Sequence, residues 1–352
     1  MNVTDWIARI QPLDEGAMQA ARLRQDRLTK PKGSLGQLEA LSVQIAGITR
    51  QVLPRLHHKV VAVMAGDHGV ARHGVSAYPQ EVTPQMVLNF LGGGAAINVL
   101  ARHIGARVVV VDMGVAADLP QHPDLVVKKI AYGTGDITIG PAMSREQAER
   151  AILAGADIVE QELEGGLDIL ATGDMGIGNT TPSAAIASAL TGLPAEQVVG
   201  RGTGIDESGL QKKRSMVQRA LEVNAPDPKD GLDVLAKVGG FEIAGLVGAI
   251  LASAASSRPV VIDGFISTAA AMIAVSLCPL VLGYLIAAHA SPELGHRRML
   301  EWLQLHPLLD LEMRLGEGTG AVLAMSIAEA ACKILCEMAT FDEAGVSGKT
   351  KG

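Results

Sequence analysis

Short runs of apolar and β-branched residues recur along the chain, and each run ends in glycine and polar residues. Four of them are "KVVAVMAGDHGV" from residue 59, "ARVVVVDMGV" from 106, "LDILATGDMGIGNTT" from 167 and "RPVVIDGFIS" from 258. Unbroken apolar runs of this length are typical of parallel strands buried on both faces. The pattern therefore predicts a buried sheet with functional loops at its strand ends.

Stretches with helical periodicity lie between these runs, over residues 145–163, 182–191 and 208–222. Strands that alternate with helices predict an α/β protein with a doubly wound parallel sheet, whose ligand site lies at the carboxyl ends of the strands. Residues 1–55 are also predicted to be helical, with a break at "KPKGSLG".

The uncharged stretch over residues 264–288 is long enough to cross a bilayer. Pro279 and Gly283 interrupt it, and it lacks flanking Lys or Arg and an aromatic belt. We interpret it as the end of a buried strand followed by one or two core helices, and we expect no membrane span.

Composition and charge narrow the class of protein. The 352 residues are 48% hydrophobic but only 3% aromatic, and their formal net charge is −7, so no electrostatic footprint for nucleic acid is present. Three cysteines without a CxxC motif argue against a disulfide framework. The first residues lack a basic and then apolar leader pattern, so we expect a cytoplasmic protein.

The sequence gives little sign of a metal site or a cofactor. His68 and His73 are five residues apart without an evident third ligand, so we expect no metal. Asp112 follows an apolar run, as in enzymes that bind phosphoribosyl pyrophosphate, but the second acid of that signature is missing. Asp67 and His68 follow the first run, where loop scaffolding and function are equally possible.

Two glycine-rich loops are candidates for binding a phosphate monoester. "TGDMGIGNTT" (172–181) lies between a predicted strand and a predicted helix, and "GRGTGID" (200–206) is followed by Lys212 and Lys213. Backbone N–H groups in such loops bind anions with help from the helix dipole.

Two further segments carry candidate chemistry. In "RLGEGTGA" (314–321), Glu317 lies between glycines and close to Arg314, so it could be a general base, a cation ligand or a solvated loop residue. "GVSAYPQEVTPQM" (74–86) offers Tyr78, Gln85 and Met86 to a flat aromatic ligand, or it is an ordinary surface loop.

Nine motifs in one order over nearly the whole chain resemble the nicotinate-nucleotide:dimethylbenzimidazole phosphoribosyltransferase family. They are "KPKGSLGQLE", "AGDHGV", "GVSAYPQEVTPQM", "GGGAAINVLAR", "GPAMSREQA", "GDMGIGNTT", "GRGTG", "DGFIS" and "RLGEGTGA". Each motif alone has moderate specificity, and the ordered set is highly specific.

The resemblance implies a Rossmann-like three-layer parallel sheet and a small helical domain built from both chain ends. We expect residues 1–55 plus 325–352 in the small domain and residues 56–324 in the large catalytic domain. It also implies a homodimer in which the small domain of one subunit helps to close the site of the other. The implied substrates are nicotinate mononucleotide and 5,6-dimethylbenzimidazole, with no cofactor.

The same resemblance carries roles to individual residues. Glu317 matches the catalytic base, and Asp174 is a further catalytic candidate. The loop of Asp174 usually reads Gly-Glu-Met-Gly in the family, so the acidic side chain here is one methylene shorter than the usual glutamate. The predicted substrate-binding residues are Tyr78, Gln85, Met86, Met175, Gly176, Gly178, Asn179, Gly202, Gly204, Lys213, Ser291, Arg314 and Leu315. Gln85, Met86 and Leu315 fall in the benzimidazole pocket, and the matched glycines, Lys213, Ser291 and Arg314 lie around the phosphate and carboxylate ends.

Two alternatives remain open at this point. One is a sibling transferase that uses another base or a phenol as acceptor, since acceptor choice depends on the shape of the pocket. The other is a non-catalytic nucleotide-binding module, which the glycine loops alone would support equally well. Glu317 distinguishes the second, because a binding module needs no acid facing an uncharged ring.

Overall fold

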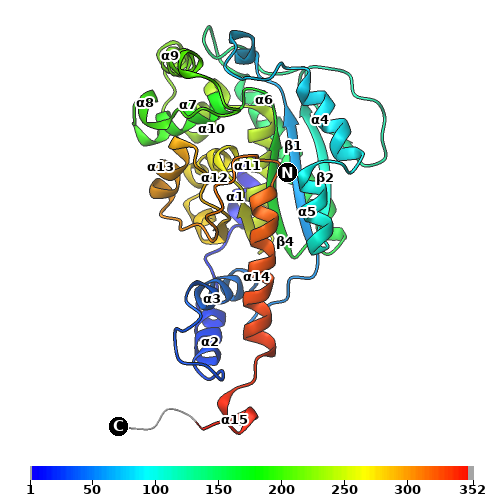
Figure 1. Ribbon diagram of the computed structural model, residues 1–352, viewed down its shortest axis with the longest axis vertical. Coiled ribbons are helices and arrows are strands. Elements are labelled where there is room, and N and C mark those ends of the chain that lie inside the picture. Colours follow the sequence, from blue (N-terminus) through cyan, green and yellow to red (C-terminus); the bar gives the residue numbers. More distant parts are fainter. Residues whose placement is uncertain (1, 348–352) are drawn as a thin grey trace.

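The computed structural model describes residues 2–347, and the centre of this part of the chain is a parallel sheet of six strands in the order β3-β2-β1-β4-β5-β6 (Figure 1). The strands are β1 (Lys59–Gly66), β2 (Arg107–Gly114), β3 (Leu125–Val127), β4 (Ile169–Met175), β5 (Val260–Ile262) and β6 (Leu285–Ala287). The predicted α/β class and parallel sheet are confirmed.

The four apolar runs form β1, β2, β4 and β5, as predicted. Every residue of β1 is buried, and Val63 pairs with Val110 of β2 on one side and with Gly173 of β4 on the other. Helices cover both faces of the sheet, so the central strands are almost entirely apolar, and β4 carries its polar residues Thr172 and Asp174 toward its carboxyl end.

The sequence pattern did not identify β3 and β6. Each has three residues, too few for a recognisable run. β6 lies inside the uncharged stretch 264–288, which the structure divides into α12 (Phe265–Leu277), a 3₁₀ turn (Pro279–Tyr284) and β6. The interpretation of this stretch as core is confirmed. β5 ends at Ile262, before the stretch begins, and the strand within the stretch is β6, which follows the helix.

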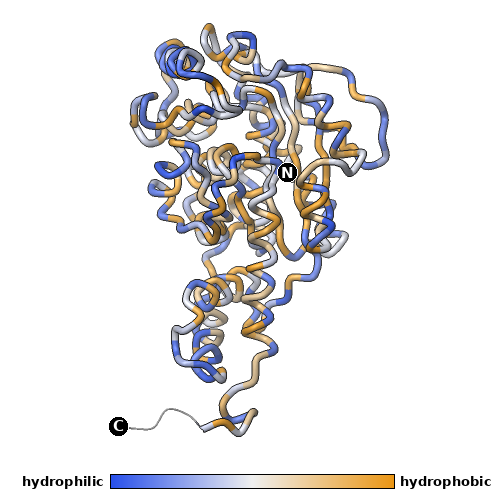
Figure 2. Tube along the Cα trace, in the orientation of Figure 1, coloured by the Kyte–Doolittle hydropathy of each residue, from blue (hydrophilic) through white to orange (hydrophobic). Residues whose placement is uncertain are grey.

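Two layers of helices enclose the sheet. The helices on one side are α1 (Val3–Arg9), α6 (Arg145–Glu164), α7 (Thr180–Thr191), α8 (Ala195–Val198), α9 (Glu207–Asn224), α10 (Gly231–Val238), α11 (Phe241–Ala255), α12 and α13 (Leu294–Leu303), and those on the other are α4 (Val82–Leu91), α5 (Ala96–Ile104) and α14 (Thr319–Glu337). In Figure 2 the strands and the helices beside them are largely hydrophobic, whereas the outer helix α9 is largely hydrophilic.

Helices α6 and α11 approach so closely that their backbones touch. A side chain at Gly155 of α6 would overlap the carbonyl of Gly245 in α11, and one at Gly248 would overlap the carbonyl of Ile152. The apolar surface of α11 is buried along almost its whole length, which fixes this layer against the sheet.

A narrower part of the molecule projects below the sheet in Figure 1. It contains α2 (Glu15–Gln25), α3 (Gln37–Thr49), the second half of α14 and α15 (Phe341–Ala344). Helix α1 instead packs against α6 and α11 of the larger part. The boundaries 1–55 and 325–352 stay a prediction, and residues 348–352 of the second range lie outside the described part of the chain.

Between residues 2 and 347, α14 is the one helix that is long and apolar enough to cross a membrane. More than half of its apolar window is buried inside the protein. It packs against β4, β5, α3 and α5, as a core helix does.

The order of the strands determines where a site can form. From β1 the chain moves outward through β2 and β3, and it then returns to the other side of β1 to add β4, β5 and β6. The strand order therefore reverses between β1 and β4. Ligands of open α/β sheets bind at such a switch point, beyond the carboxyl ends of the strands.

Candidate active site

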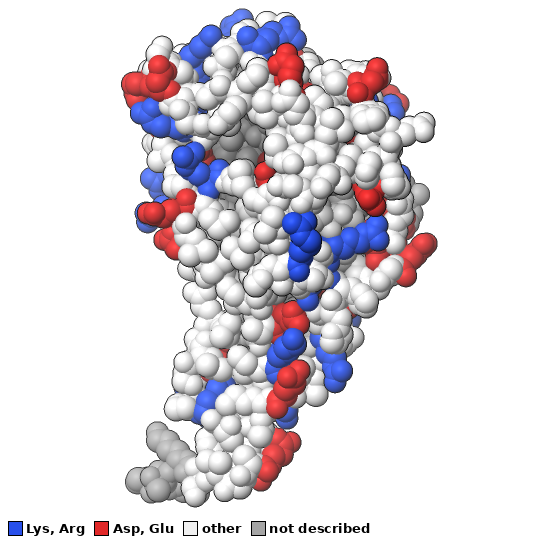
Figure 3. All heavy atoms as spheres, turned by 45° about the vertical axis from the view of Figure 1, so that its right-hand side comes forward, with Lys and Arg blue, Asp and Glu red and all other residues white. Residues whose placement is uncertain are grey.

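A cavity of about 420 Å³ lies at this switch point, and Figure 3 shows the surface hollowed in the upper part of the molecule. Segments that follow β1, β4, β5 and β6 line it, together with the loop before α14. Eleven of the predicted site residues line the cavity: Tyr78, Met86, Asp174, Met175, Gly176, Asn179, Gly202, Ser291, Arg314, Leu315 and Glu317.

The loop that carries Glu317 lies directly on the sheet, which explains the glycines on either side of it. The carbonyl of Glu317 occupies the space that a side chain on Gly173 of β4 would need. Gly316, Glu317 and Gly318 all have positive φ, at 81°, 63° and 93°. For the non-glycine Glu317 this conformation costs about 1–3 kcal/mol, which the surrounding contacts must offset.

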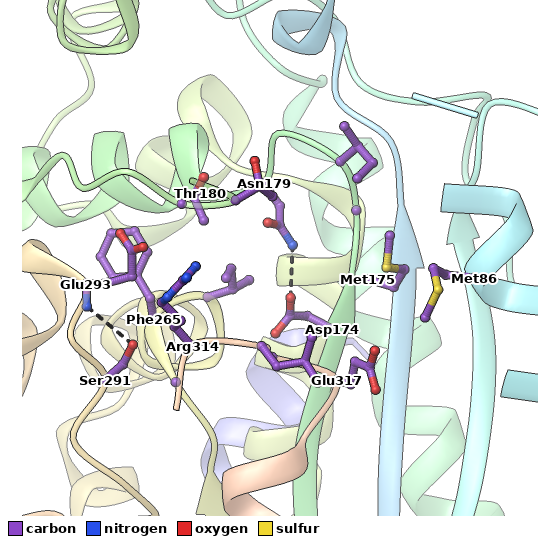
Figure 4. A pocket seen from close by; sticks show the side chains of 18 of the residues that line it. Met86, Asp174, Met175, Asn179, Thr180, Phe265, Ser291, Glu293, Arg314 and Glu317 are labelled. Atoms are coloured by element: carbon purple, nitrogen blue, oxygen red, sulfur yellow. Dashed lines mark hydrogen bonds between the residues drawn. The ribbon is translucent and has the colours of Figure 1, made fainter. Parts of the chain in front are cut away.

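The Glu317 carboxylate is buried at the beginning of α5. Its side chain is enclosed near Met86 (Figure 4), and its Oε2 accepts a hydrogen bond of 3.2 Å from the N–H of Ile97. Burial raises the pKa of Glu317 above its usual value, the nearby Asp263 raises it further, and the bond from Ile97 opposes both. Such a carboxylate is a stronger proton acceptor than an exposed one.

Asp174 is the second acid on the cavity wall. Its Oδ2 accepts a hydrogen bond of 2.9 Å from Nδ2 of Asn179 (Figure 4). Burial, followed by repulsion from Asp263, Glu242 and Glu317, raises the pKa of Asp174 to about 8 despite this bond. Asp174 therefore carries a proton at neutral pH, whereas a carboxylate of ordinary pKa would not.

The two predicted phosphate loops lie next to each other. Lys213 of α9 is buried behind them and donates a hydrogen bond of 2.6 Å to Oγ1 of Thr180, at the first turn of α7. The backbone of Gly202 comes so close that a side chain there would lie 3.1 Å from Nζ of Lys213. Burial lowers the pKa of Lys213 to about 8, and Glu293 acts in the opposite direction.

The other end of the cavity is mainly apolar. Met86 of α4 and Met175 at the end of β4 place their sulfur atoms near each other in Figure 4, and Val82 and Leu315 also line the cavity. This wall suits a flat heteroaromatic ring. Methionine adapts readily to such ligands because its chain is flexible and its sulfur is polarisable.

Four predicted residues do not line the cavity. Gln85 is exposed on α4, Gly178 and Gly204 shape the two loops with positive φ, and Lys213 lies behind Thr180 and Gly202. Their substrate-binding roles remain predictions, and for Lys213 contact with a ligand would require Thr180 or the loop to shift.

Several lining residues were not predicted. Thr180 and Phe265 lay within quoted motifs but were not assigned a role, whereas His289 and Glu293 follow β6, which was not recognised. His289 is buried beside Asp263, with 3.7 Å between Nε2 and Oδ1. Recognising β6 would have drawn attention to the loop that follows it.

His68 and His73 each have a carboxylate partner of their own. Nε2 of His68 lies 2.8 Å from Oε1 of Glu242, and Nε2 of His73 lies 2.7 Å from Oδ2 of Asp136. In the part of the chain that the structure describes, no group of three or more His, Cys, Asp or Glu residues could hold a metal ion.

Comparison with known proteins identifies the class to which this fold and cavity belong. A family model described as "Phosphoribosyltransferase" matches residues 10–346. The chain is 64% identical over 349 residues to the nicotinate-nucleotide–dimethylbenzimidazole phosphoribosyltransferase of Roseiflexus sp. (strain RS-1), with 99% of each chain covered. It is 54% identical over 345 residues to the Geobacter sulfurreducens protein of the same name, with 98% of each covered.

A solved structure, that of CobT from Thermus thermophilus, matches with a TM-score of 0.91 at 51% identity. The match covers 94% of this chain and 99% of that one. The protein is thus an enzyme of the phosphoribosyltransferase class. Within that class, the chain belongs to the nicotinate-nucleotide–dimethylbenzimidazole phosphoribosyltransferase family, as the ordered motifs predicted.

Proposed function

We propose that the protein transfers the 5-phosphoribosyl group of nicotinate mononucleotide to 5,6-dimethylbenzimidazole, giving α-ribazole 5′-phosphate and nicotinate. The observation that carries this proposal is the division of one cavity into two unlike ends. Glu317 adjoins an apolar wall at one end, and the glycine loops with Lys213 behind them form the other.

The chemistry of the donor fits a site of this kind. Nicotinate mononucleotide carries a pyridinium on C1′, which leaves as a neutral ring without an acid or a metal to assist it. The C1′–N bond to nicotinate breaks while the pyridine-like nitrogen of the benzimidazole forms the new bond. Attack from the opposite face inverts C1′ and gives the α-linkage directly.

Glu317 supplies the proton acceptor in this scheme. As the new bond forms, positive charge develops on the benzimidazole and its remaining N–H becomes acidic. A carboxylate at that N–H stabilises the charge and takes the proton. A group positioned for this purpose contributes about 10²–10⁴-fold to the rate.

Among the alternatives, a sibling transferase would differ only in the acceptor molecule that binds at the apolar end of the cavity. The names of the similar proteins favour an enzyme over a non-catalytic module.

We also propose a cytoplasmic homodimer. Tyr78 and Leu315 line the cavity yet are 56% and 58% exposed, as expected for a cavity mouth that a partner subunit covers.

The decisive experiment is an end-point assay with nicotinate mononucleotide and a series of acceptors that includes dimethylbenzimidazole, adenine and phenol. Release of nicotinate together with α-ribazole 5′-phosphate, with the anomer assigned by NMR, is the expected result. Nicotinate release with only a purine or a phenol would support the sibling transferase, and no release with any acceptor would contradict the proposal.

A further inference from the structure

The position of Glu317 depends on how α14 begins. Glu317 immediately precedes Gly318, the N-cap residue of this 19-residue helix, and Gly318 has no side chain with which to cap it. The first N–H groups of a helix need partners from outside the helix. A partner that fixes these groups also fixes the residue just before them.

Asp263 is that partner. This residue follows β5 and is 1% exposed; its Oδ1 accepts a hydrogen bond of 2.8 Å from the N–H of Ala321, and its Oδ2 accepts one of 3.3 Å from the N–H of Gly318. Both carboxylate oxygens therefore bind the first turn of α14, on either side of Thr319.

The sheet in turn fixes Asp263. Its own N–H donates a hydrogen bond of 3.3 Å to Oγ1 of Thr172 in β4, and that hydroxyl donates to the carbonyl of Val261 in β5. The series of contacts from β4 and β5 to Asp263 and on to Gly318 and Ala321 lies wholly within the buried part of the protein.

We propose that Asp263 is a positioning residue for Glu317: by capping α14 with both carboxylate oxygens, it holds the Glu317 loop on the sheet with the carboxylate of Glu317 at the acceptor end of the cavity. This inference rests on the proposed function for the role of Glu317 as the base. It adds a residue that does not itself line the cavity.

Asp263 also acts on the ionisation of Glu317. Burial raises the pKa of Asp263 itself, and the adjacent His289 and the N–H groups of Ala321 and Gly318 oppose this rise by favouring the charged carboxylate. Two acids lie near Glu317: Asp263 in the loop after β5 and Asp174 in β4. The N–H of Ile97 in α5 donates a hydrogen bond to Glu317, and His289 in the loop after β6 lies beside Asp263. After burial, repulsion from Asp263 is a further cause of the raised pKa of Glu317, as it is for Asp174. Removing this charge should let Glu317 ionise at lower pH.

The test compares Asp263→Asn with Asp112→Asn. Asp112 is also 1% exposed, lies at the end of β2, and accepts a hydrogen bond of 2.9 Å from the N–H of Val115, but it is outside the cavity. Both substitutions neutralise a buried acid that binds backbone N–H groups near the end of a strand, and Asp112→Asn additionally leaves Lys129 without the ion pair of 3.3 Å that it forms with Oδ2 of Asp112. Any general cost in stability should appear in both variants.

For Asp263→Asn we expect kcat to fall about 10²-fold, as for a catalytic group displaced by about 1 Å, with KM for both substrates nearly unchanged. The acid limb of the kcat–pH profile should move to lower pH. Asp112→Asn should retain both kcat and the position of that limb. A kcat for Asp263→Asn equal to that of Asp112→Asn would overturn the proposal.

Amide hydrogen exchange at residues 318–321 gives a readout that does not require turnover. Exchange should become faster in Asp263→Asn and stay unchanged in Asp112→Asn. Unchanged exchange in both variants would overturn the positioning role of Asp263, whatever reaction the enzyme catalyses. Conversely, faster exchange with no turnover by the unsubstituted enzyme would refute the proposed function alone. If Asp263→Asn does not fold, Thr172→Val removes the hydroxyl that fixes Asp263 and should produce the same changes on a smaller scale.

Discussion

At the scale of single residues, Glu317 combines burial, a strained backbone and a position at an apolar wall. We predict that Glu317→Gln lowers kcat by about 10²–10⁴-fold, because it keeps the shape of the side chain but cannot accept the proton. Binding of the benzimidazole should survive better than turnover. Steady-state kinetics with both substrates will measure this, and Glu312→Gln, an exposed acid just upstream, is the matched control.

The pH profile gives an independent test of the same residue. The pKa of Glu317 is raised above 4.5, so kcat should fall as the pH decreases through a value above 4.5. This acid limb should be absent in Glu317→Gln. A variant that keeps more than about a third of the original kcat, far from the loss typical of a missing base, would assign the proton to another group.

Asp174 makes a prediction about stability. Its pKa rises from 3.8 to about 8 on folding, so between these values the folded protein retains a proton that the unfolded chain releases. The free energy of unfolding therefore falls with rising pH, by at most about 1.4 kcal/mol per pH unit for one such group. Asp174→Asn should be increasingly stabilised relative to the unsubstituted protein between about pH 5 and about pH 8.

Denaturant unfolding at about pH 5 and about pH 8 measures the difference in free energy of unfolding between the variant and the unsubstituted protein. Asp310→Asn, at an exposed position, is the control, and its difference should change little with pH. A constant difference would mean that Asp174 is ionised in the folded protein. In the same variant, a loss of kcat beyond any loss of stability would support the direct substrate contact predicted from the sequence.

Lys213 tests the phosphate end of the cavity. Lys213→Ala should raise KM for nicotinate mononucleotide about 10–100-fold, because it removes the buried positive charge behind the phosphate loops together with its hydrogen bond to Thr180. Nicotinate riboside should be a far poorer donor. Lys212→Ala, at the exposed neighbouring position, should leave KM unchanged. Equal use of the riboside and the nucleotide by the unsubstituted enzyme would remove the basis for a phosphate site.

At the scale of elements, the contact between the Glu317 loop and β4 leaves no room for a side chain on Gly173. Gly173→Ala would place a methyl group against the carbonyl of Glu317, so we predict a loss of stability of about 1–3 kcal/mol and a clear loss of kcat. Gly140→Ala is the control, because nothing lies within 4 Å of its added Cβ. If Gly173→Ala had the same melting temperature and kcat as Gly140→Ala, the Glu317 loop could move away from β4 without loss of stability or activity.

At the scale of the whole molecule, the projecting part and the exposed cavity mouth predict a dimer. The exposed apolar residues include Leu23 in α2 as well as Tyr78 and Leu315 at the cavity. Sedimentation equilibrium should give twice the mass of the chain. Leu23→Glu should weaken association if α2 contributes to the interface, whereas a monomer that is fully active at nanomolar concentration would refute the shared site.

The class of fold and the outline of the site could be predicted from the amino-acid sequence alone. Long apolar runs with glycine-rich ends are typical of strands covered on both faces, so β1, β2, β4 and β5 were recognisable without coordinates. The ordered motifs added the family and ten of the residues that line the cavity, and the resemblance to that family added Ser291, which lies outside the motifs. These features are local in sequence, which is why they could be read from it.

Which groups face one another became known only from the folded chain. β6 is too short to leave a periodic signal, so His289 and Glu293 in the loop after it were not assigned to the site, and Ser291 in the same loop was assigned only through the family resemblance. The bonds from Asp263 to Gly318 and Ala321 join residues that are 55 and 58 positions apart, and the raised pKa of Asp174 comes from burial and from acids on three other segments. Burial, hydrogen bonding and electrostatic repulsion depend on distance in space, and the packing of strands and helices sets that distance.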